Sequence, residues 1–259
     1  KLCEGLKGSA VTSLDLGRNG IGAGGATALA AIFNKTMITN LNLANNQLCG
    51  VDHTGRGTYS AEGIIKLCEG LKGSAVTSLN LEYNNVGAKG ATALATILNE
   101  TKITNLDLRF NQLGPKGGVA LADGLKGNST LEELNLEGNN IRDKGASALA
   151  AILKETKITD LNLASNQLCR LDSQSRGTYT AEGITKLCEG LKGSAVTSLD
   201  LGRNGIGAGG ATALAAIFNK TMITNLNLAN NQLCGVDHTG RGTYSAEGII
   251  KLCEGLKGS

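Results

Sequence analysis

The sequence predicts an α/β solenoid, in which short parallel strands and helices alternate along one stacked array. Three observations lead to this fold class. A strand-like frame recurs eight times, and each copy is followed by a helix-like stretch. Neither half of such a unit can bury its own apolar face, so each unit must stack on its neighbours. We therefore expect residues 1–259 to form one domain of about eight repeats.

The first element of each unit is a short strand. In one copy Leu41 and Leu43 alternate with Asn40 and Asn42, which is the period-two pattern of a strand with one buried face. The first leucines of the eight copies are Leu14, Leu41, Leu79, Leu106, Leu134, Leu161, Leu199 and Leu226.

An asparagine marks the point where the chain must turn away from the strand. Its amide carries both donors and an acceptor, so when buried it can satisfy the backbone groups of a tight turn. It stands five residues after the first leucine in every copy, at Asn19, Asn46, Asn84, Asn111, Asn139, Asn166, Asn204 and Asn231.

A helix is predicted in the second half of each unit. Within residues 25–33, Ala26, Leu29, Ala30 and Phe33 have the spacing of one buried helical stripe. Packed helices need about 8 to 10 Å, whereas neighbouring strands need about 4.8 Å, so the helical side is longer. The stack should therefore bend into a horseshoe with the strands on its concave face.

Three units carry eleven extra residues, at 49–59, 169–179 and 234–244, and otherwise the repeat is 27 or 28 residues long. Each insertion ends in Arg-Gly-Thr-Tyr. In a structural interpretation Tyr59 folds back as a lid and Ser60 caps the next helix. In a functional interpretation the insertions present Arg and Tyr side chains to a partner or to another copy of the chain. The candidate residues are Arg56, Tyr59, Arg176, Tyr179, Arg241 and Tyr244.

The frame L-x-L-x-x-N-x-[L/I/V], together with the helix of residues 21–33, resembles the leucine-rich repeats of the ribonuclease-inhibitor-like subclass. The resemblance covers essentially the whole chain. It implies a horseshoe with parallel strands inside and helices outside, and a non-enzymatic scaffold that binds a protein partner on its concave face and inserted loops. It does not identify the partner, because such repeats bind many unrelated proteins.

Two rows of residues beside the strand leucines are expected to face the concave side. The row of Asp or Asn that includes Asp15 and Asn42 is uniform, and hydrogen bonds between side chains on adjacent strands would explain it. The next row is irregular and contains aromatic and charged residues of the types that are common in binding hot spots. The candidates there are Arg18, Glu82, Tyr83, Arg109, Phe110 and Glu137.

Residues 1–74 are identical to residues 186–259, so this duplication is either recent or engineered. Terminal repeats normally carry a polar cap, but Leu2 and Leu256 occupy ordinary core positions. The alternative function is therefore a structural, self-associating array that forms filaments or rings by head-to-tail contacts.

Chemistry is weakly indicated. His53 and His238 occupy one repeat position, where the middle insertion has Ser173, so we expect no catalytic or metal-binding residue, no cofactor and no enzyme. A third possibility is an enzyme activator similar to GTPase-activating proteins. The sequence does not favour it, because it has no long acidic tail and no lone catalytic arginine. A net charge of +3 is too mild to indicate nucleic acid, and no apolar run is long enough to span a membrane.

The seven cysteines lie at repeat positions. The spacing of Cys49 and Cys68 does not match a zinc site. Cys68 occupies the position that Ala30 has in another unit, and this equivalence favours a small buried thiol. The alternative is a disulfide within each inserted unit. Free thiols indicate a cytoplasmic protein. Four sequences have the pattern of a glycosylation acceptor, beginning at Asn34, Asn99, Asn128 and Asn219. They leave a secreted protein open as the alternative, although they also fit an asparagine that ends a helix before a polar loop.

Overall fold

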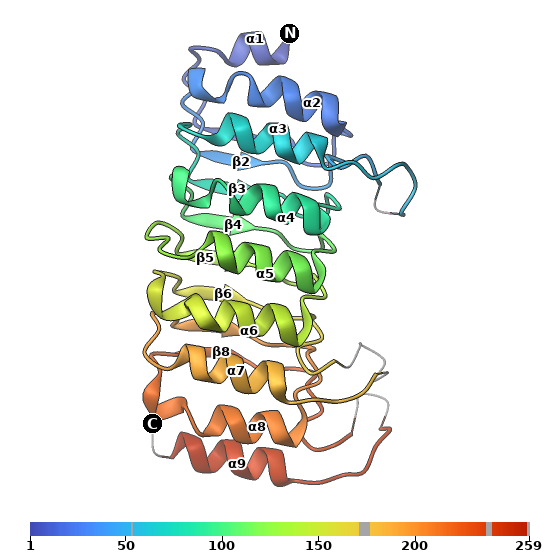
Figure 1. Cartoon of the computed structure of the whole chain (residues 1–259), viewed down its shortest axis with the longest axis vertical. Coiled ribbons are helices and arrows are strands. Elements are labelled where there is room, and N and C mark those ends of the chain that lie inside the picture. The colour runs from blue at the N-terminus through green and yellow to red at the C-terminus, as the bar shows by residue number, and fades with distance from the viewer. Residues whose placement is uncertain (53, 171–176, 237–239, 258–259) are drawn as a thin grey trace.

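The computed structural model describes residues 1–52, 54–170, 177–236 and 240–257, in which strands and helices alternate along the chain (Figure 1). The strands are β1 Ser13–Asp15, β2 Asn40–Asn42, β3 Ser78–Asn80, β4 Asn105–Asp107, β5 Glu133–Asn135, β6 Asp160–Asn162, β7 Ser198–Asp200 and β8 Asn225–Asn227. The α-helices are α1 Leu2–Leu6, α2 Gly22–Ala30, α3 Glu62–Leu71, α4 Gly87–Ala95, α5 Gly114–Gly124, α6 Arg142–Ile152, α7 Glu182–Leu191, α8 Gly207–Ala215 and α9 Glu247–Leu256. Short 3₁₀ helices lie at Phe33–Lys35, Leu98–Glu100, Leu153–Glu155 and Phe218–Lys220.

The described strands form one parallel sheet in the order β1 to β8, so neighbours in sequence are neighbours in the sheet. Each pair aligns leucine with leucine, as Leu79 of β3 pairs with Leu41 of β2 and with Leu106 of β4. This register places every strand leucine on the same face, which confirms the predicted fold class.

The core lies between the sheet and the helices. Leu41 and Leu43 are buried and belong to the same apolar cluster as Leu67 and Leu71 of α3. The cluster continues from unit to unit without a break, because no single unit has enough apolar surface to form a core of its own.

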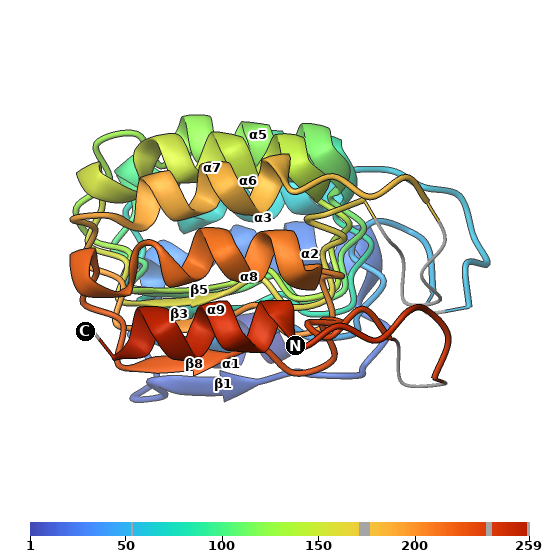
Figure 2. The ribbon, with the colours of Figure 1, turned by 90° about the horizontal axis from the view of Figure 1, so that it is seen from below.

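The stack curves with its helices outside. In the end-on view the helices of the middle units, such as α5, lie farther out on the helical side than α2 and α9 at the two ends (Figure 2). The strands follow the same arc on the inner side, so the sheet forms the concave face, as predicted.

Candidate functional site

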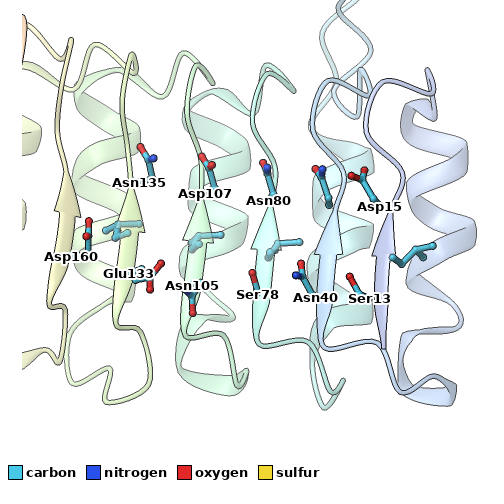
Figure 3. Close-up of a pocket in the computed structure, with 15 residues that line it drawn as sticks. Ser13, Asp15, Asn40, Ser78, Asn80, Asn105, Asp107, Glu133, Asn135 and Asp160 are labelled. Atoms are coloured by element: carbon cyan, nitrogen blue, oxygen red, sulfur yellow. The ribbon is translucent and has the colours of Figure 1, made fainter. Parts of the chain in front are cut away.

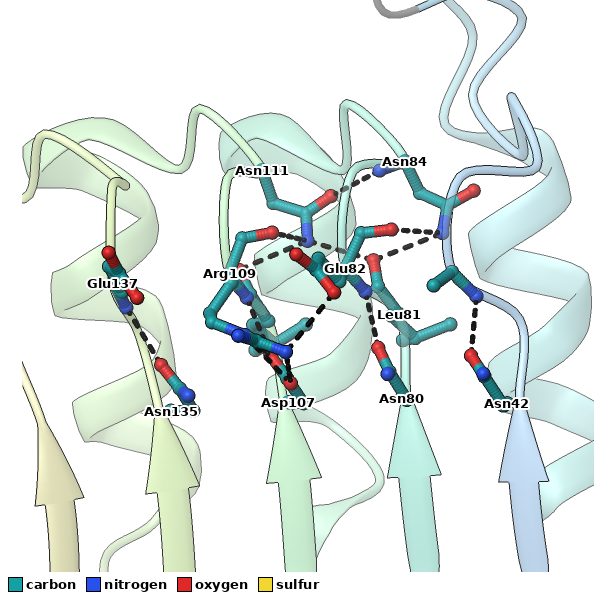
Figure 4. A network of polar contacts seen from close by, with 12 residues as sticks. Asn42, Asn80, Leu81, Glu82, Asn84, Asp107, Arg109, Asn111, Asn135 and Glu137 are labelled. Carbon is teal, nitrogen blue, oxygen red and sulfur yellow. Dashed lines mark hydrogen bonds and ion pairs between the residues drawn. The ribbon is translucent and has the colours of Figure 1, made fainter. Parts of the chain in front are cut away.

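A ladder of buried asparagine side chains fixes the backbone where each strand ends (Figure 4). The Oδ1 of Asn111 accepts hydrogen bonds from the backbone N–H groups of Asn84 and Val86 in the preceding unit, at 3.0 and 3.2 Å. Its Nδ2 donates to the carbonyls of Leu81 and Leu108, at 2.9 and 3.0 Å. The predicted role in the turn is confirmed, and the same amide also holds the neighbouring unit. Corresponding contacts to the preceding unit are made by Asn46, Asn84, Asn139, Asn166, Asn204 and Asn231.

The Asp or Asn at the end of each strand serves its own unit. The Oδ1 of Asn80 accepts a hydrogen bond from the backbone N–H of Glu82 at 2.9 Å, and the other units repeat this contact. Within the described ranges, one bond of this row joins two strands, from Asn227 Nδ2 to Asp200 Oδ2 at 2.9 Å. The prediction of a ladder between strands is therefore wrong for most of the row. The backbone N–H two residues further along bonds the acceptor oxygen instead, because this local contact costs less conformational entropy than a bond to the next strand.

The strands β1 to β6 line a shallow groove of about 470 Å³ on the concave face (Figure 3). Its lining is largely polar and forms two rows, of which the row before the strand leucines was not singled out from the sequence. Glu133 and Asp160 are charged members of that row, and they are directly paired in register on β5 and β6. The other residues in the row along the groove are Ser13, Asn40, Ser78 and Asn105.

Tyr83 and Phe110 form a stacked aromatic pair just beyond β3 and β4. Their ring centroids are 4.6 Å apart and the rings are inclined by 12°. A methyl group at Gly138 would lie 2.4 Å from the Phe110 ring, so the bare backbone of the next unit makes room for it. Tyr83 remains 42% exposed. The structure thus brings two of the predicted residues together in an accessible stack.

Arg109 lies between two carboxylates beside this pair (Figure 4). Its guanidinium is 2.9 Å from Asp107 and 3.1 Å from Glu82, so it joins β4 to the preceding unit. The hydrogen bond with Asp107 raises the pKa of Arg109 above its ordinary value. Burial raises the pKa of Glu82, against the opposing effect of the Arg109 charge.

The two remaining concave candidates lie on either side of this cluster. Arg18 follows β1, two strands away from β3, and its side chain is exposed. Glu137 follows β5 and makes no ion pair within the part of the chain that the structure describes; its charge contributes to the raised pKa values of Glu82 and Arg109. Arg18 is therefore separated from the stack by a unit, whereas Glu137 is in the adjoining one.

The described parts of the inserted segments project from one edge of the stack (Figure 1). The Tyr59 hydroxyl donates a hydrogen bond to the carbonyl of Val86 at 2.8 Å, and Tyr179 bonds Ile206 in the same way. Burial raises the pKa of both hydroxyls. The predicted lid is therefore confirmed at these two positions, whereas Tyr244 is 70% exposed.

The remaining loop candidates are only partly described. Arg56 and Arg241 are exposed, while Arg176 lies outside the described residues, as do His53, Ser173 and His238. The first insertion lies beside the aromatic pair, because Asn85, two residues after Tyr83, donates a hydrogen bond to the carbonyl of Val51 at 3.0 Å.

The second insertion begins with an ion pair that the equivalent units lack. Arg170 contacts the buried carboxylate of Asp143, and it has a left-handed backbone with a φ of 62°. Gly50 occupies the matching position in the first insertion with a φ of 77°. The hydrogen bond from Arg170 lowers the pKa of Asp143.

The cysteines are free thiols, and burial raises the pKa to about 12 for Cys49, Cys68, Cys169 and Cys188. The buried-thiol interpretation is confirmed at these four positions. Over the described ranges, no group of three or more His, Cys, Asp or Glu residues is placed to hold a metal ion. None of the helices described is both long and apolar enough to cross a membrane.

Comparisons with known proteins agree with this architecture. The leucine-rich repeat family model matches residues 10–30, 75–95, 99–122, 127–150 and 195–215. The leucine-rich repeat-containing protein 45 of Gallus gallus is 39% identical over 94 residues, which are 36% of this chain and 13% of that protein's length. The crystal structure of the leucine-rich repeat-containing protein LegL7 from Legionella pneumophila aligns with 100% of this chain and 85% of its own, with a TM-score of 0.51 and 20% identity. That structural likeness shows the fold, a leucine-rich repeat solenoid, and the leucine-rich repeat model matches five separate stretches of the chain.

Proposed function

We propose that this chain is a protein-interaction scaffold that binds its partner on the concave face. Leucine-rich repeat proteins generally serve as such scaffolds, and the curved stack supplies an extended surface. The contact is centred on Tyr83 and Phe110, with Glu82 and Arg109 beside them; we call these four residues the aromatic surface. The single observation that carries the proposal is the stack of two rings at 4.6 Å, in which Tyr83 is exposed and Phe110 is half-buried.

The turn of the repeat sets the backbone conformation of the two aromatic residues. Tyr83 and Phe110 have φ angles of 54° and 53°, and the equivalent Arg18, Asn45 and Arg203 have angles of 60°, 54° and 57°. Asn and Gly adopt this left-handed region at lower cost, so two adjoining units carry a bulky aromatic residue where the turn itself would favour a smaller one.

The aromatic surface is also preorganised. The two rings hold each other, and Arg109 is fixed from both sides by Asp107 and Glu82. Large, rigid aromatic and Arg side chains lose little conformational entropy on binding, which is why such residues dominate interface energies. The neighbouring insertion extends the surface, and we propose that Arg56 and the equivalent loop residues Arg176, Arg241 and Tyr244 add contacts at this edge. Tyr59 and Tyr179 contribute chiefly by holding their loops to the next unit.

Partner binding by the double variant Tyr83→Ala/Phe110→Ala tests this proposal. Partners enriched with the wild-type chain are purified, and their dissociation constants are measured by calorimetry. We expect the double variant to bind at least about a hundredfold more weakly, because it loses two side chains that each contribute roughly 1.5 kcal/mol to the binding free energy. The matched control is Ile65→Ala/Val119→Ala, which removes exposed apolar side chains from the helical face and should leave binding unchanged. Equal binding by the two double variants would refute the concave site.

Head-to-tail self-association is a second candidate. In the duplicated segments, Leu71 of α3 is 1% exposed, whereas the identical Leu256 of α9 is 56% exposed. A second copy stacked on α9 would bury that apolar face. Sedimentation velocity over a wide concentration range tests this: larger species that disappear in Leu256→Glu support the array, and a constant monomer rejects it.

We further propose that the repeats belong to the ribonuclease-inhibitor-like subclass, because units of 27 or 28 residues combine a short strand with an α-helix. The buried thiols support a reducing, cytoplasmic setting for a protein without enzymatic activity. Mass spectrometry of alkylated cysteines in protein purified from its own cells tests the redox setting. Native disulfides would contradict it.

A further inference from the structure

We propose that the segment of the partner that lies along the concave groove is cationic, with Lys or Arg side chains placed between Tyr83 and the carboxylates of Glu133, Glu137 and Asp160. This inference rests on the proposed function and specifies the chemistry of the partner. It goes beyond the aromatic surface because it commits to one occupant, a basic stretch of polypeptide.

The charges on this part of the face are strongly one-sided. Between β3 and β6 it presents the carboxylates of Glu82, Asp107, Glu133, Glu137 and Asp160, and one guanidinium, that of Arg109. Their formal sum is −4, whereas the whole chain carries +3. The concave face therefore differs in sign from the molecule as a whole, and a positive partner would be steered to it.

The internal ion pairs do not use up this charge. Arg109 is already engaged by Asp107 and Glu82. Glu133, Glu137 and Asp160 form no ion pair or side-chain hydrogen bond within the described ranges. Three carboxylates thus remain available to a ligand in the two units that follow the aromatic pair.

Two of these carboxylates are placed unfavourably for the free protein. Glu133 and Asp160 are directly paired in register on adjacent strands, where like charges repel. In the other units described along the groove, this row has Ser or Asn at every position. A Lys or Arg side chain between the two carboxylates would replace this repulsion with two attractions, so the gain in the complex exceeds that of a single ion pair.

The aromatic pair suits the same ligand. A cation over the face of a Tyr ring is attracted by the quadrupole of the ring, and Tyr83 is accessible. Arg109 cannot occupy the Glu133–Asp160 position, because Asp107 and Glu82 hold its guanidinium at 2.9 and 3.1 Å. From β1 to β6 the groove covers five strand spacings, about 24 Å, or roughly seven extended residues.

The test uses the whole chain and three peptides of about eight residues, in which Ser alternates with Lys, Glu or Gln. Binding is followed by two-dimensional ¹⁵N–¹H NMR at about 20 mM and at about 300 mM NaCl. With the Lys peptide, we expect shifts confined to residues 78–83, 105–110, 133–138 and 160–164, and much weaker binding at the higher salt concentration. The Glu and Gln peptides should cause no comparable shifts. Lys-peptide shifts spread over the helical face would overturn the proposal.

A charge-neutral variant, Glu133→Gln/Asp160→Asn, separates specific from general electrostatics. We expect it to bind the Lys peptide about tenfold more weakly. The matched control Glu69→Gln/Glu189→Gln removes the same charge from the helical face and should bind as the wild type does. Equal weakening in both double variants would refute a groove-specific site.

The two proposals fail in different ways. A natural partner that requires Tyr83 and Phe110 but binds the Glu133→Gln/Asp160→Asn variant with unchanged affinity would refute the cationic segment and leave the scaffold function intact. A partner that is indifferent to Tyr83 and Phe110 would refute the proposed function itself. A nucleic acid, which is anionic, should not bind this groove, and its binding there would contradict the inference.

Discussion

Replacing Asn111 by alanine tests the asparagine ladder at its centre. The substitution removes the acceptor for the backbone N–H groups of Asn84 and Val86, which are both buried. A buried donor without a partner costs about 1 to 3 kcal/mol. We therefore expect the free energy of unfolding to fall by about 4 kcal/mol, measured by urea denaturation with circular dichroism. Amide hydrogen exchange at Asn84 and Val86 should accelerate more than elsewhere.

The chain supplies its own control for this experiment. Asn19 stands at the same frame position in the first unit, but its exposed side chain donates only to the carbonyls of Leu16 and Gly17 in its own unit. Asn19→Ala should therefore cost less than about 1 kcal/mol. Asn111→Leu, which keeps the volume and removes the hydrogen bonds, should be about as destabilising as Asn111→Ala. Similar losses at Asn19 and Asn111 would show that the links between units contribute little.

Three further predictions concern the loops and thiols. Tyr59→Phe removes the bond to the Val86 carbonyl and should lower the free energy of unfolding by about 1 kcal/mol, whereas Tyr244→Phe, at an exposed hydroxyl, should leave it unchanged in the same thermal denaturation assay. Arg170→Gly leaves the Asp143 carboxylate without its guanidinium and should lower the free energy of unfolding at neutral pH. The folded-state pKa of Asp143 is lowered, so the stabilisation from this pair is present above the unfolded-state pKa and is lost as the pH falls through the folded-state pKa. Urea denaturation curves of the variant and the wild type should therefore converge in acid. Curves that stay apart in acid would refute this assignment. A maleimide should label the exposed Cys253 first, and labelling in the folded state at comparable rates would contradict the burial of Cys49, Cys68, Cys169 and Cys188.

The backbone of this protein is predictable from its sequence because every unit repeats the same local solution. The period-two leucines, the asparagine and the helical stripe each specify one step of the chain, and Leu41 and Asn46 are buried as expected. Repetition then fixes the register, since a strand displaced by one residue would turn its leucines to solvent.

The surface is less predictable because it depends on contacts between units. The sequence singles out Tyr83 and Phe110, but their stacking also requires the absence of a side chain at Gly138, one unit farther along. Glu133 and Asp160 were missed because each looks ordinary within its own unit. Aligning the row before the strand leucines would have revealed them as charged neighbours among Ser and Asn. The roles of the concave and loop residues in binding stay predictions.

The asparagine ladder makes the joints between units interchangeable. The link from Asn166 to Asn204 crosses a 38-residue unit at 2.9 Å, and the link from Asn84 to Asn111 crosses a 27-residue unit at 3.0 Å. The units of Asn46 to Asn204 each offer the same acceptor to the unit before and the same N–H to the unit after. Several units can therefore be copied at once and arrive with compatible ends, whatever the origin of the identical segments 1–74 and 186–259. Array length can change in evolution without a new packing solution, while the side chains on the concave face diverge independently.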